Sequence, residues 1–519
     1  MNSDNAKSLP NRAICMTCKK VVPAHHEERA GQVVLVKECP DHGREEVIVS
    51  TNSRRYQEKR DVIGYQGEAQ KTCLLNCTEC KAHKLPSLVF IDVTNRCNMN
   101  CPICLANIPA MGFRFDPPME YFEKIFQVLA AREPKPKIQL FGGEPTVRQD
   151  LIEMIELAKK KYGLSARVVT NGLKLADEEY CKKLVATGTQ IMFSYDGADE
   201  EVNDRTRKHA TAVAKKLKAL ENLKKFRKSK VTIMATVGVD TNGKGLRELV
   251  EYCHEQRGLV AALDMIPLTA TWGPEQVDAR NTTIEDIERL AAEALPGWEF
   301  FSAGAFYKLA ALRETFNLGR ITFGGAHPNC EAVSLLVSDG QRYRPLSSYM
   351  KRPFQEGVRA LIEFDGAMAE KLKSSLLARL FGARGRKLAY GLALWRVGRQ
   401  YLNLREIFGG AALPGIAKIG FGLACGRKMK DLLRAHTRCH AILRTIILPF
   451  VEPMCVESAR LVDCPAAFAY EHPQTGEIKF MPVCAWPIFK DATLRKTAER
   501  YGAGQSAGDN DLVQVAEKA

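Results

Sequence analysis

Residues 87–107 read SLVFIDVTNRCNMNCPICLAN, and this stretch decides the fold. An apolar, β-branched run that is typical of a buried strand leads directly into a loop with the spacing C-x3-C-x2-C. Three thiolates at this spacing can hold three irons of a [4Fe-4S] cube, whose full ligation by cysteine would need a fourth. The loop therefore favours a cluster with one open iron, and a ferredoxin-like cluster with a distant fourth cysteine is the alternative. The three candidate ligands are Cys97, Cys101 and Cys104.

Strand-like runs recur after this loop and alternate with segments of helical periodicity, such as 119–132 and 151–162. Such alternation predicts an α/β fold with a parallel sheet and right-handed crossovers. Six repeats indicate a partial (β/α)6 TIM-like barrel over residues 87–300 rather than a closed barrel of eight strands. The five later runs are 137–143, 166–172, 190–197, 230–237 and 259–266.

Three short motifs end the second, third and fourth of these strands: GGEPT (142–146), TNG (170–172) and SYDG (194–197). Ligands of α/β sheets bind at the carboxyl ends of the strands. Glycines let a backbone approach a ligand closely, and a carboxylate suits an ammonium group. Each motif alone is also compatible with ordinary turn chemistry, but their order along the sheet indicates a binding site. The candidate binding residues are Gly142, Gly143, Glu144, Asn171, Ser194 and Asp196.

With these motifs, residues 87–270 resemble the radical S-adenosylmethionine (SAM) superfamily. The resemblance implies that the three cysteines ligate a [4Fe-4S] cluster whose open iron chelates SAM. It also implies that Glu144 contacts the amino group of SAM and that Ser194 and Asp196 contact the ribose. A low-potential electron donor such as ferredoxin or flavodoxin would reduce the cluster, and a 5′-deoxyadenosyl radical would then abstract hydrogen from the substrate. Ile103 departs from the aromatic residue that often precedes the third cysteine.

Two further groups of metal-ligating residues precede the barrel. In residues 1–60, two short pairs separated by twenty residues have the spacing of a four-coordinate site for Zn²⁺ or iron in a small ribbon. Residues 61–86 repeat the C-x3-C-x2-C spacing and predict an auxiliary iron–sulfur cluster, with Cys330 as candidate fourth ligand. The first group is Cys15, Cys18, Cys39 and His42, and the second is Cys73, Cys77 and Cys80.

The C-terminal part carries four more cysteines, enough for a second auxiliary [4Fe-4S] cluster, with buried structural cysteines as the alternative. A hairpin is predicted around 334–346, several helices over 355–445, and another hairpin over 466–483. We divide this part into a helical, basic region (301–460), a cluster-bearing hairpin (461–503) and a flexible tail (504–519). The four cysteines are Cys439, Cys455, Cys464 and Cys484.

Composition narrows the class of protein. The chain has 519 residues, a formal charge of +15 and 17 cysteines. Clustered cysteines in a chain without a secretory signal favour metal sites and a cytoplasmic location. Residues 371–444 hold 16 Lys and Arg against two acidic residues, and Leu, Phe and Trp lie among them. Such segments are typical of interfacial helices, so we expect peripheral contact with the inner membrane face and no nucleic acid. A solvated basic face is the alternative.

The order of all these features resembles the tetraether lipid synthase group, and this resemblance covers nearly the whole chain. It implies hydrogen abstraction from alkyl chains of a membrane lipid, followed by carbon–carbon bond formation. Related proteins are radical methylases that act on a pterin with a folate-type methylene donor, which makes methylation of a small heterocycle the alternative. A multi-cluster electron-transfer protein is a more remote alternative function. No catalytic side chain is singled out by the sequence.

Overall fold

The computed structural model describes residues 11–65, 73, 75–77, 86–209, 211–226, 230–269, 279–317, 327–424, 427, 429–450, 453–462 and 464–502. Its N-terminal part is a four-stranded antiparallel sheet in the order β1-β2-β3-β4, as the ribbon prediction requires. The strands are β1 (Arg12–Ile14), β2 (Val21–Arg29), β3 (Gln32–Cys39) and β4 (Gly43–Ser50).

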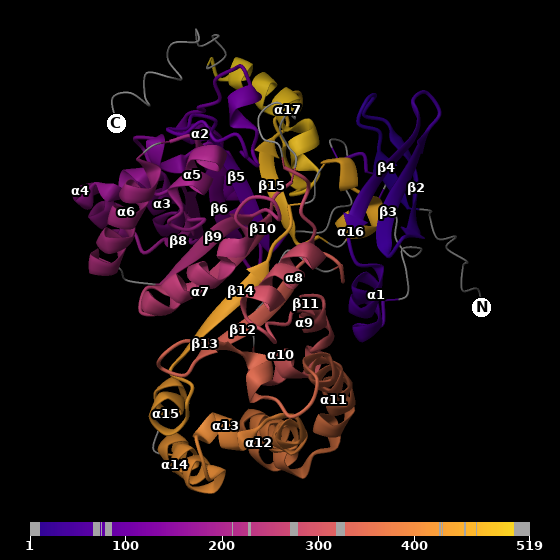
Figure 1. The fold of residues 1–519 in the computed structure, drawn as a ribbon. Helices are drawn as coiled ribbons and strands as arrows, with labels where there is room; N and C mark the ends of the chain where they lie inside the picture. The colour runs from indigo at the N-terminus through magenta and orange to yellow at the C-terminus, as the bar shows by residue number, and fades with distance from the viewer. Residues whose placement is uncertain are drawn as a thin grey trace.

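The centre of the molecule is a second sheet, in which the six predicted strands pair in parallel in chain order (Figure 1). This finding confirms the α/β fold with a mostly parallel sheet. The strands are β5 (Leu88–Thr94), β6 (Lys137–Gly142), β7 (Ser165–Thr170), β8 (Gln190–Ser194), β9 (Val231–Val237) and β10 (Val260–Pro267).

Two strands from the C-terminal part extend this series at both ends. β14 (Ala441–Ile447) pairs in parallel with β10, and β15 (Ala466–Glu471) pairs in parallel with β5. Eight consecutive strands of the sheet are therefore parallel. The helix prediction for 355–445 is wrong at its end, because the β-branched run AILRTII enters the sheet as a strand.

Antiparallel strands flank the parallel set, and both predicted hairpins are confirmed. The strand β12 pairs with β14, so part of the region that we predicted to be helical belongs to the barrel sheet. These strands are β11 (Phe301–Ser302), β12 (Ala332–Ser338), β13 (Tyr343–Pro345) and β16 (Ile478–Pro482).

Helices cover the outer face of the parallel strands. In α2, Tyr121, Phe122, Ile125, Phe126 and Leu129 recur at helical spacing and are buried. The helices that follow the barrel strands are α2 (Met119–Ala130), α3 (Leu151–Lys160), α4 (Glu178–Ala186), α5 (Glu200–Arg207), α6 (Ala212–Phe226), α7 (Leu246–Glu255) and α8 (Ile284–Ala294). Four shorter or later helices are α9 (Ala305–Lys308), α10 (Ala310–Phe316), α16 (Ser458–Leu461) and α17 (Trp486–Arg500).

The basic region folds as a group of helices at the far end of the β12–β14 ladder, away from the barrel helices α2–α6 (Figure 1). Among the helices described, none is long and apolar enough to cross a membrane. The group consists of α11 (Phe354–Ser374), α12 (Leu376–Tyr401), α13 (Leu404–Phe408), α14 (Ala412–Ala424) and α15 (Met429–His436).

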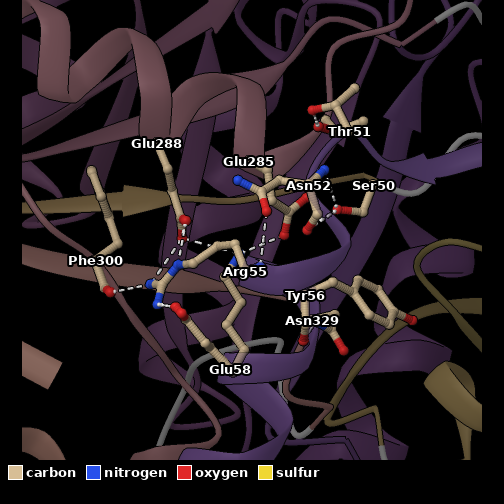
Figure 2. Close-up of polar contacts among 12 residues, drawn as sticks. Ser50, Thr51, Asn52, Arg55, Tyr56, Glu58, Glu285, Glu288, Phe300 and Asn329 are labelled. Atoms are coloured by element: carbon tan, nitrogen blue, oxygen red, sulfur yellow. Dashed lines mark hydrogen bonds and ion pairs between the residues drawn. The ribbon is translucent and has the colours of Figure 1, made fainter. Parts of the chain in front are cut away.

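Helix α1 (Ser53–Val62) attaches the ribbon to the barrel. Its buried Lys59 forms ion pairs with Glu285 (2.7 Å) and Glu288 (3.0 Å) of α8. Arg55 reaches the same Glu288 at 2.8 Å, and Figure 2 shows this guanidinium between Glu288 and Glu58. Buried pairs of this kind fix one mutual orientation, because separating them would leave uncompensated charge.

Candidate active site and metal centres

The cysteine loop rests directly on the GGE motif. Gly143 N donates to Thr94 O and Glu144 N to Arg96 O, both at 2.8 Å. A Cβ on Gly142 would lie 2.3 Å from Thr94 O, and one on Gly143 would lie 2.2 Å from Arg96 O. The two glycines are therefore required by the close backbone approach of the segment that leads into the cluster loop.

Glu144 is buried, and its carboxylate joins two strand ends. It accepts hydrogen bonds from Thr146 N (3.0 Å), Thr146 Oγ1 (2.6 Å), Thr170 Oγ1 (2.7 Å) and Asn171 N (2.6 Å). Burial raises the pKa of Glu144, and these donors offset part of the effect. The side chain of Asn171 in turn donates to Asn98 Oδ1 in the cysteine loop at 2.7 Å. The GGE, TNG and cysteine motifs thus form one hydrogen-bonded unit.

The SYDG motif places Asp196 beside Arg207, a residue that the sequence analysis did not identify. Asp196 Oδ2 pairs with Arg207 at 2.7 Å, and Asp196 Oδ1 accepts from Thr236 N at 2.8 Å. Arg207 also approaches the Cys101 thiol, which helps to raise the pKa of the guanidinium. Asp196 therefore positions Arg207, and its role as a ribose contact stays a prediction. Ser194 lines a cavity of about 140 Å³ at the carboxyl ends of the strands.

This active-site cavity is bounded by the cysteine loop on one side and by apolar side chains on the other. Its lining includes Ile103, Phe141, Arg207, Met234, Thr236 and Phe450. Ile103, which stands where an aromatic residue often precedes the third cysteine, thus contributes an aliphatic side chain to the cavity wall.

Lys216 on α6 is the second residue that the sequence analysis missed. It is 1% exposed, its ammonium has no hydrogen-bond partner among the residues described, and burial lowers its pKa to about 8. The charged groups that act on it are Asp196, Arg207, Cys101 and Glu144, so it lies among the predicted site residues. The sequence did contain a signal for a buried lysine, because Lys216 lies at helical spacing on the apolar face that the buried positions 212, 219, 220 and 223 define.

Comparison with known proteins decides the family. The chain is 30% identical over 373 residues to the 7,8-dihydro-6-hydroxymethylpterin dimethyltransferase of Methanocaldococcus jannaschii, covering 68% of this chain and 72% of that protein. The sequence model of the radical SAM superfamily matches residues 91–253. The chain belongs to the radical SAM superfamily. A shorter match, 33% identical over 32% of this chain and 40% of the relative, is to the Fe-coproporphyrin III synthase of Methanosarcina barkeri.

Among solved structures, the radical SAM part is similar to SuiB of Streptococcus suis bound to its precursor peptide SuiA. The identity is 14%, the TM-score is 0.33, and the match covers 54% of this chain and 68% of that one.

The observed residues fit the radical SAM cofactors. Three thiols stand beside a buried carboxylate, Glu144, and a buried ammonium, Lys216, that has no hydrogen-bond partner among the described residues. These two charges are complementary to the amino and carboxylate groups of SAM, while the cysteines would hold the cluster. When bound, the cluster and SAM supply the radical. Glu144 and Lys216 would orient the amino acid end of SAM, and the active-site cavity offers space beside them.

The ribbon brings its four predicted ligands together. The ligand atoms of Cys15, Cys18, Cys39 and His42 all lie within 4.8 Å of one another. The sequence model of the HMPTM N-terminal zinc ribbon domain matches residues 11–51. Three cysteines and one histidine are a normal ligand set for a closed structural Zn²⁺ site. The cluster of ligands therefore fits a zinc ribbon.

Replacing His42 by alanine should remove one metal ion per chain and loosen the ribbon, because its apolar core is small. That core consists mainly of Ala13, Ala24 and Leu35, and structural Zn²⁺ supplies about 10 kcal/mol or more of folding free energy in such domains. Metal analysis and limited proteolysis would show the change. His25→Ala is the control, since His25 is exposed and its ring bonds to Glu27 rather than facing the ligand cluster. Full metal content in His42→Ala would contradict the ligand assignment.

The remaining cysteines are grouped differently from our expectation. Cys330 lies near Cys484, and both influence the pKa of Cys464, which burial raises most. Cys330 had been expected beside the 73–80 triad. Cys77 lies near Tyr470, Cys73 packs against the central core, and Cys80 is outside the described residues.

Cys439 is separated from the other late cysteines by the length of a strand. It precedes β14, close to Arg434 and Tyr349 of the helical region, whereas Cys455 follows the same strand. Seven residues of strand span roughly 23 Å, so one cluster cannot include both. Cys455 and Arg460 line the same small cavity of about 60 Å³, and Arg460 contacts Cys330.

Proposed function

We propose that this radical SAM enzyme methylates a small nitrogen heterocycle of the pterin class. The main supporting observation is the similarity to the pterin dimethyltransferase over 68% of this chain, together with the separate matches of the radical SAM model and the HMPTM zinc ribbon model. The active-site cavity supports this proposal, since it shares Met234 and Phe450 with a second cavity of mixed polar and apolar lining inside the barrel.

An auxiliary iron–sulfur cluster belongs to the proposal, with a ligand set that differs from the predicted one. We infer Cys330, Cys464, Cys484 and Cys455 as its ligands, because the first three lie together and Cys455 borders Arg460 beside them. Arg460 would balance part of the cluster charge. The external reductant would be ferredoxin or flavodoxin.

One observation favours membrane lipid as the second candidate substrate. Large apolar side chains are exposed on α12 and α14, among them Leu380 (65%), Phe381 (63%), Leu413 (80%) and Phe421 (75%). Basic residues surround them in the segment 371–444. Apolar contact combined with positive charge suits an anionic lipid surface. Peripheral membrane contact, tetraether synthase-like carbon–carbon coupling and a role in lipid metabolism are parts of this second proposal.

One experiment separates the two substrates. Iron-reconstituted enzyme is incubated with SAM, a low-potential reductant, a folate-type methylene donor and either 7,8-dihydro-6-hydroxymethylpterin or a membrane lipid extract. We expect SAM-dependent methylated pterin by mass spectrometry. Cross-linked or lengthened alkyl chains with an unmodified pterin would reject methylation and support the lipid candidate. Analysis of lipids and pterins in a strain without the gene gives the same decision in the cell.

A further inference from the structure

A second cavity, of about 300 Å³, lies inside the barrel and shares Met234 and Phe450 with the active-site cavity. The parallel strands contribute to its lining with residues that lie before the carboxyl ends of the strands, where the SAM motifs are. Lys137, for example, is the first residue of β6. We call it the lower cavity. Its charged and amide-bearing lining residues are Lys137, Gln139, Arg167, Gln190, Lys230, Asp264, Glu331 and Arg444, and the proposed cluster ligands Cys330, Cys464 and Cys484 line it as well.

Asp264 is a buried charged group of the lower cavity. It is 5% exposed, and its Oδ1 has no hydrogen-bond partner in the described part of the chain. In the strand register it stands opposite Met234, and Met234 stands opposite Ser194. Asp264 therefore lies beside Met234, which lines both cavities. Leaving a buried carboxylate oxygen unpaired costs about 1–3 kcal/mol, and a ligand that donates a hydrogen bond would recover this cost.

The cationic side chains Lys137, Arg167 and Arg444 line the part of the lower cavity that is farther from the predicted SAM-binding motifs. Burial and the charges of Arg167 and Arg444 lower the pKa of Lys137, which shows that the three groups lie close together. Arg167 donates to Gln190 Oε1 at 3.0 Å and is attracted by Asp264. The apolar part of the lining includes Phe90, Met192 and Phe450. The lining thus combines apolar surface, two carboxylates (Asp264 and Glu331) and several cations.

We propose that the lower cavity is the substrate chamber and that Asp264 selects a planar nitrogen heterocycle by accepting hydrogen bonds from a ring N–H and an adjacent amino group. This inference rests on the proposed function and adds the residue that determines specificity. A carboxylate matches two parallel N–H donors, as it does in bidentate pairs with arginine. The apolar walls then contact the ring, and the cations suit an anionic substituent. An alkyl chain would leave Asp264 Oδ1 desolvated without a hydrogen-bond donor.

Equilibrium binding tests this assignment. Reconstituted, SAM-loaded enzyme is titrated anaerobically with 7,8-dihydro-6-hydroxymethylpterin and with its 2-oxo analogue, in which oxygen replaces the amino group. We expect the wild type to prefer the pterin at least about tenfold, because sites built for a donor reject analogues that lack it. In Asp264→Asn this preference should fall at least about tenfold, because the amide can donate to the 2-oxo group. Asp339→Asn, in the turn between β12 and β13, is the control and should keep the preference.

The outcomes also separate this inference from the proposed function. Formation of 5′-deoxyadenosine without substrate shows that Asp264→Asn is folded and holds its cluster. If the wild type binds the pterin and Asp264→Asn keeps the same preference, the role of Asp264 is overturned while the proposed function stands. If the wild type binds neither heterocycle, the pterin substrate class itself is rejected, and the chamber assignment with it.

Discussion

Replacing Cys97 by alanine is expected to reduce SAM cleavage to background. The cluster loop offers three thiols, so loss of one leaves two ligands for a cube that normally needs at least three. We expect the iron content to fall by about four atoms per chain and the formation of 5′-deoxyadenosine to stop. Both quantities are measured after anaerobic reconstitution, with dithionite as reductant.

Cys181→Ala provides the matched control. Cys181 is a buried thiol on α4, outside every metal-ligand group described above. This variant should keep its iron and its SAM cleavage even if its melting temperature falls through the loss of core packing. Unchanged cleavage in Cys97→Ala would show that the SAM-binding cluster lies elsewhere.

Replacing Lys216 by methionine should weaken SAM binding and stabilise the protein without its cofactors. The buried ammonium has no partner among the described residues, so its removal relieves a desolvation cost. The same ammonium would hold the SAM carboxylate, and hydrogen bonds to charged groups contribute about 1.5–3 kcal/mol, or roughly 10- to 100-fold in affinity. We therefore expect a higher melting temperature before reconstitution and a higher KM for SAM afterwards.

Lys218→Met separates this effect from a general change in charge. Lys218 lies two residues later on α6, exposed to solvent and paired with Glu221 at 3.4 Å. It should leave both the melting temperature and the KM for SAM close to those of the wild type. An unchanged KM in Lys216→Met would remove Lys216 from the SAM site, and a lower melting temperature would show that its ammonium has a stabilising partner.

The parts of the site that sequence predicts are those whose chemistry is local. The cysteine loop and GGE each carry their function within a few residues, and the strand before each motif fixes its place at one edge of the sheet. The ribbon ligands form two short pairs for the same reason. Lys216, Arg207 and Asp264 lack such a signature, because their importance comes from tertiary contacts: Arg207 meets Asp196, and Asp264 faces a cavity closed by distant strands.

The helix prediction at 441–445 failed for a related reason. The Arg-rich composition around this segment suggested another interfacial helix, whereas the short run AILRTII pairs with β10 and gives β14 its strand conformation. Tertiary pairing overrides local composition in such cases. The regrouping of Cys330 with Cys464 and Cys484 has the same origin, because their sequence separation gives no spacing to interpret.

The topology of the parallel strands has a consequence for biosynthesis. Among the parallel strands, β5–β10 leave the ribosome first, and β14 and β15, which complete the two sides of the parallel set and contribute to the lower cavity, emerge last. Domains generally fold from the N-terminus during synthesis. The nascent protein therefore contains its cysteine loop long before the strands that complete the lower cavity have been synthesised. The cluster-binding loop and the walls of the substrate chamber are thus completed one after the other.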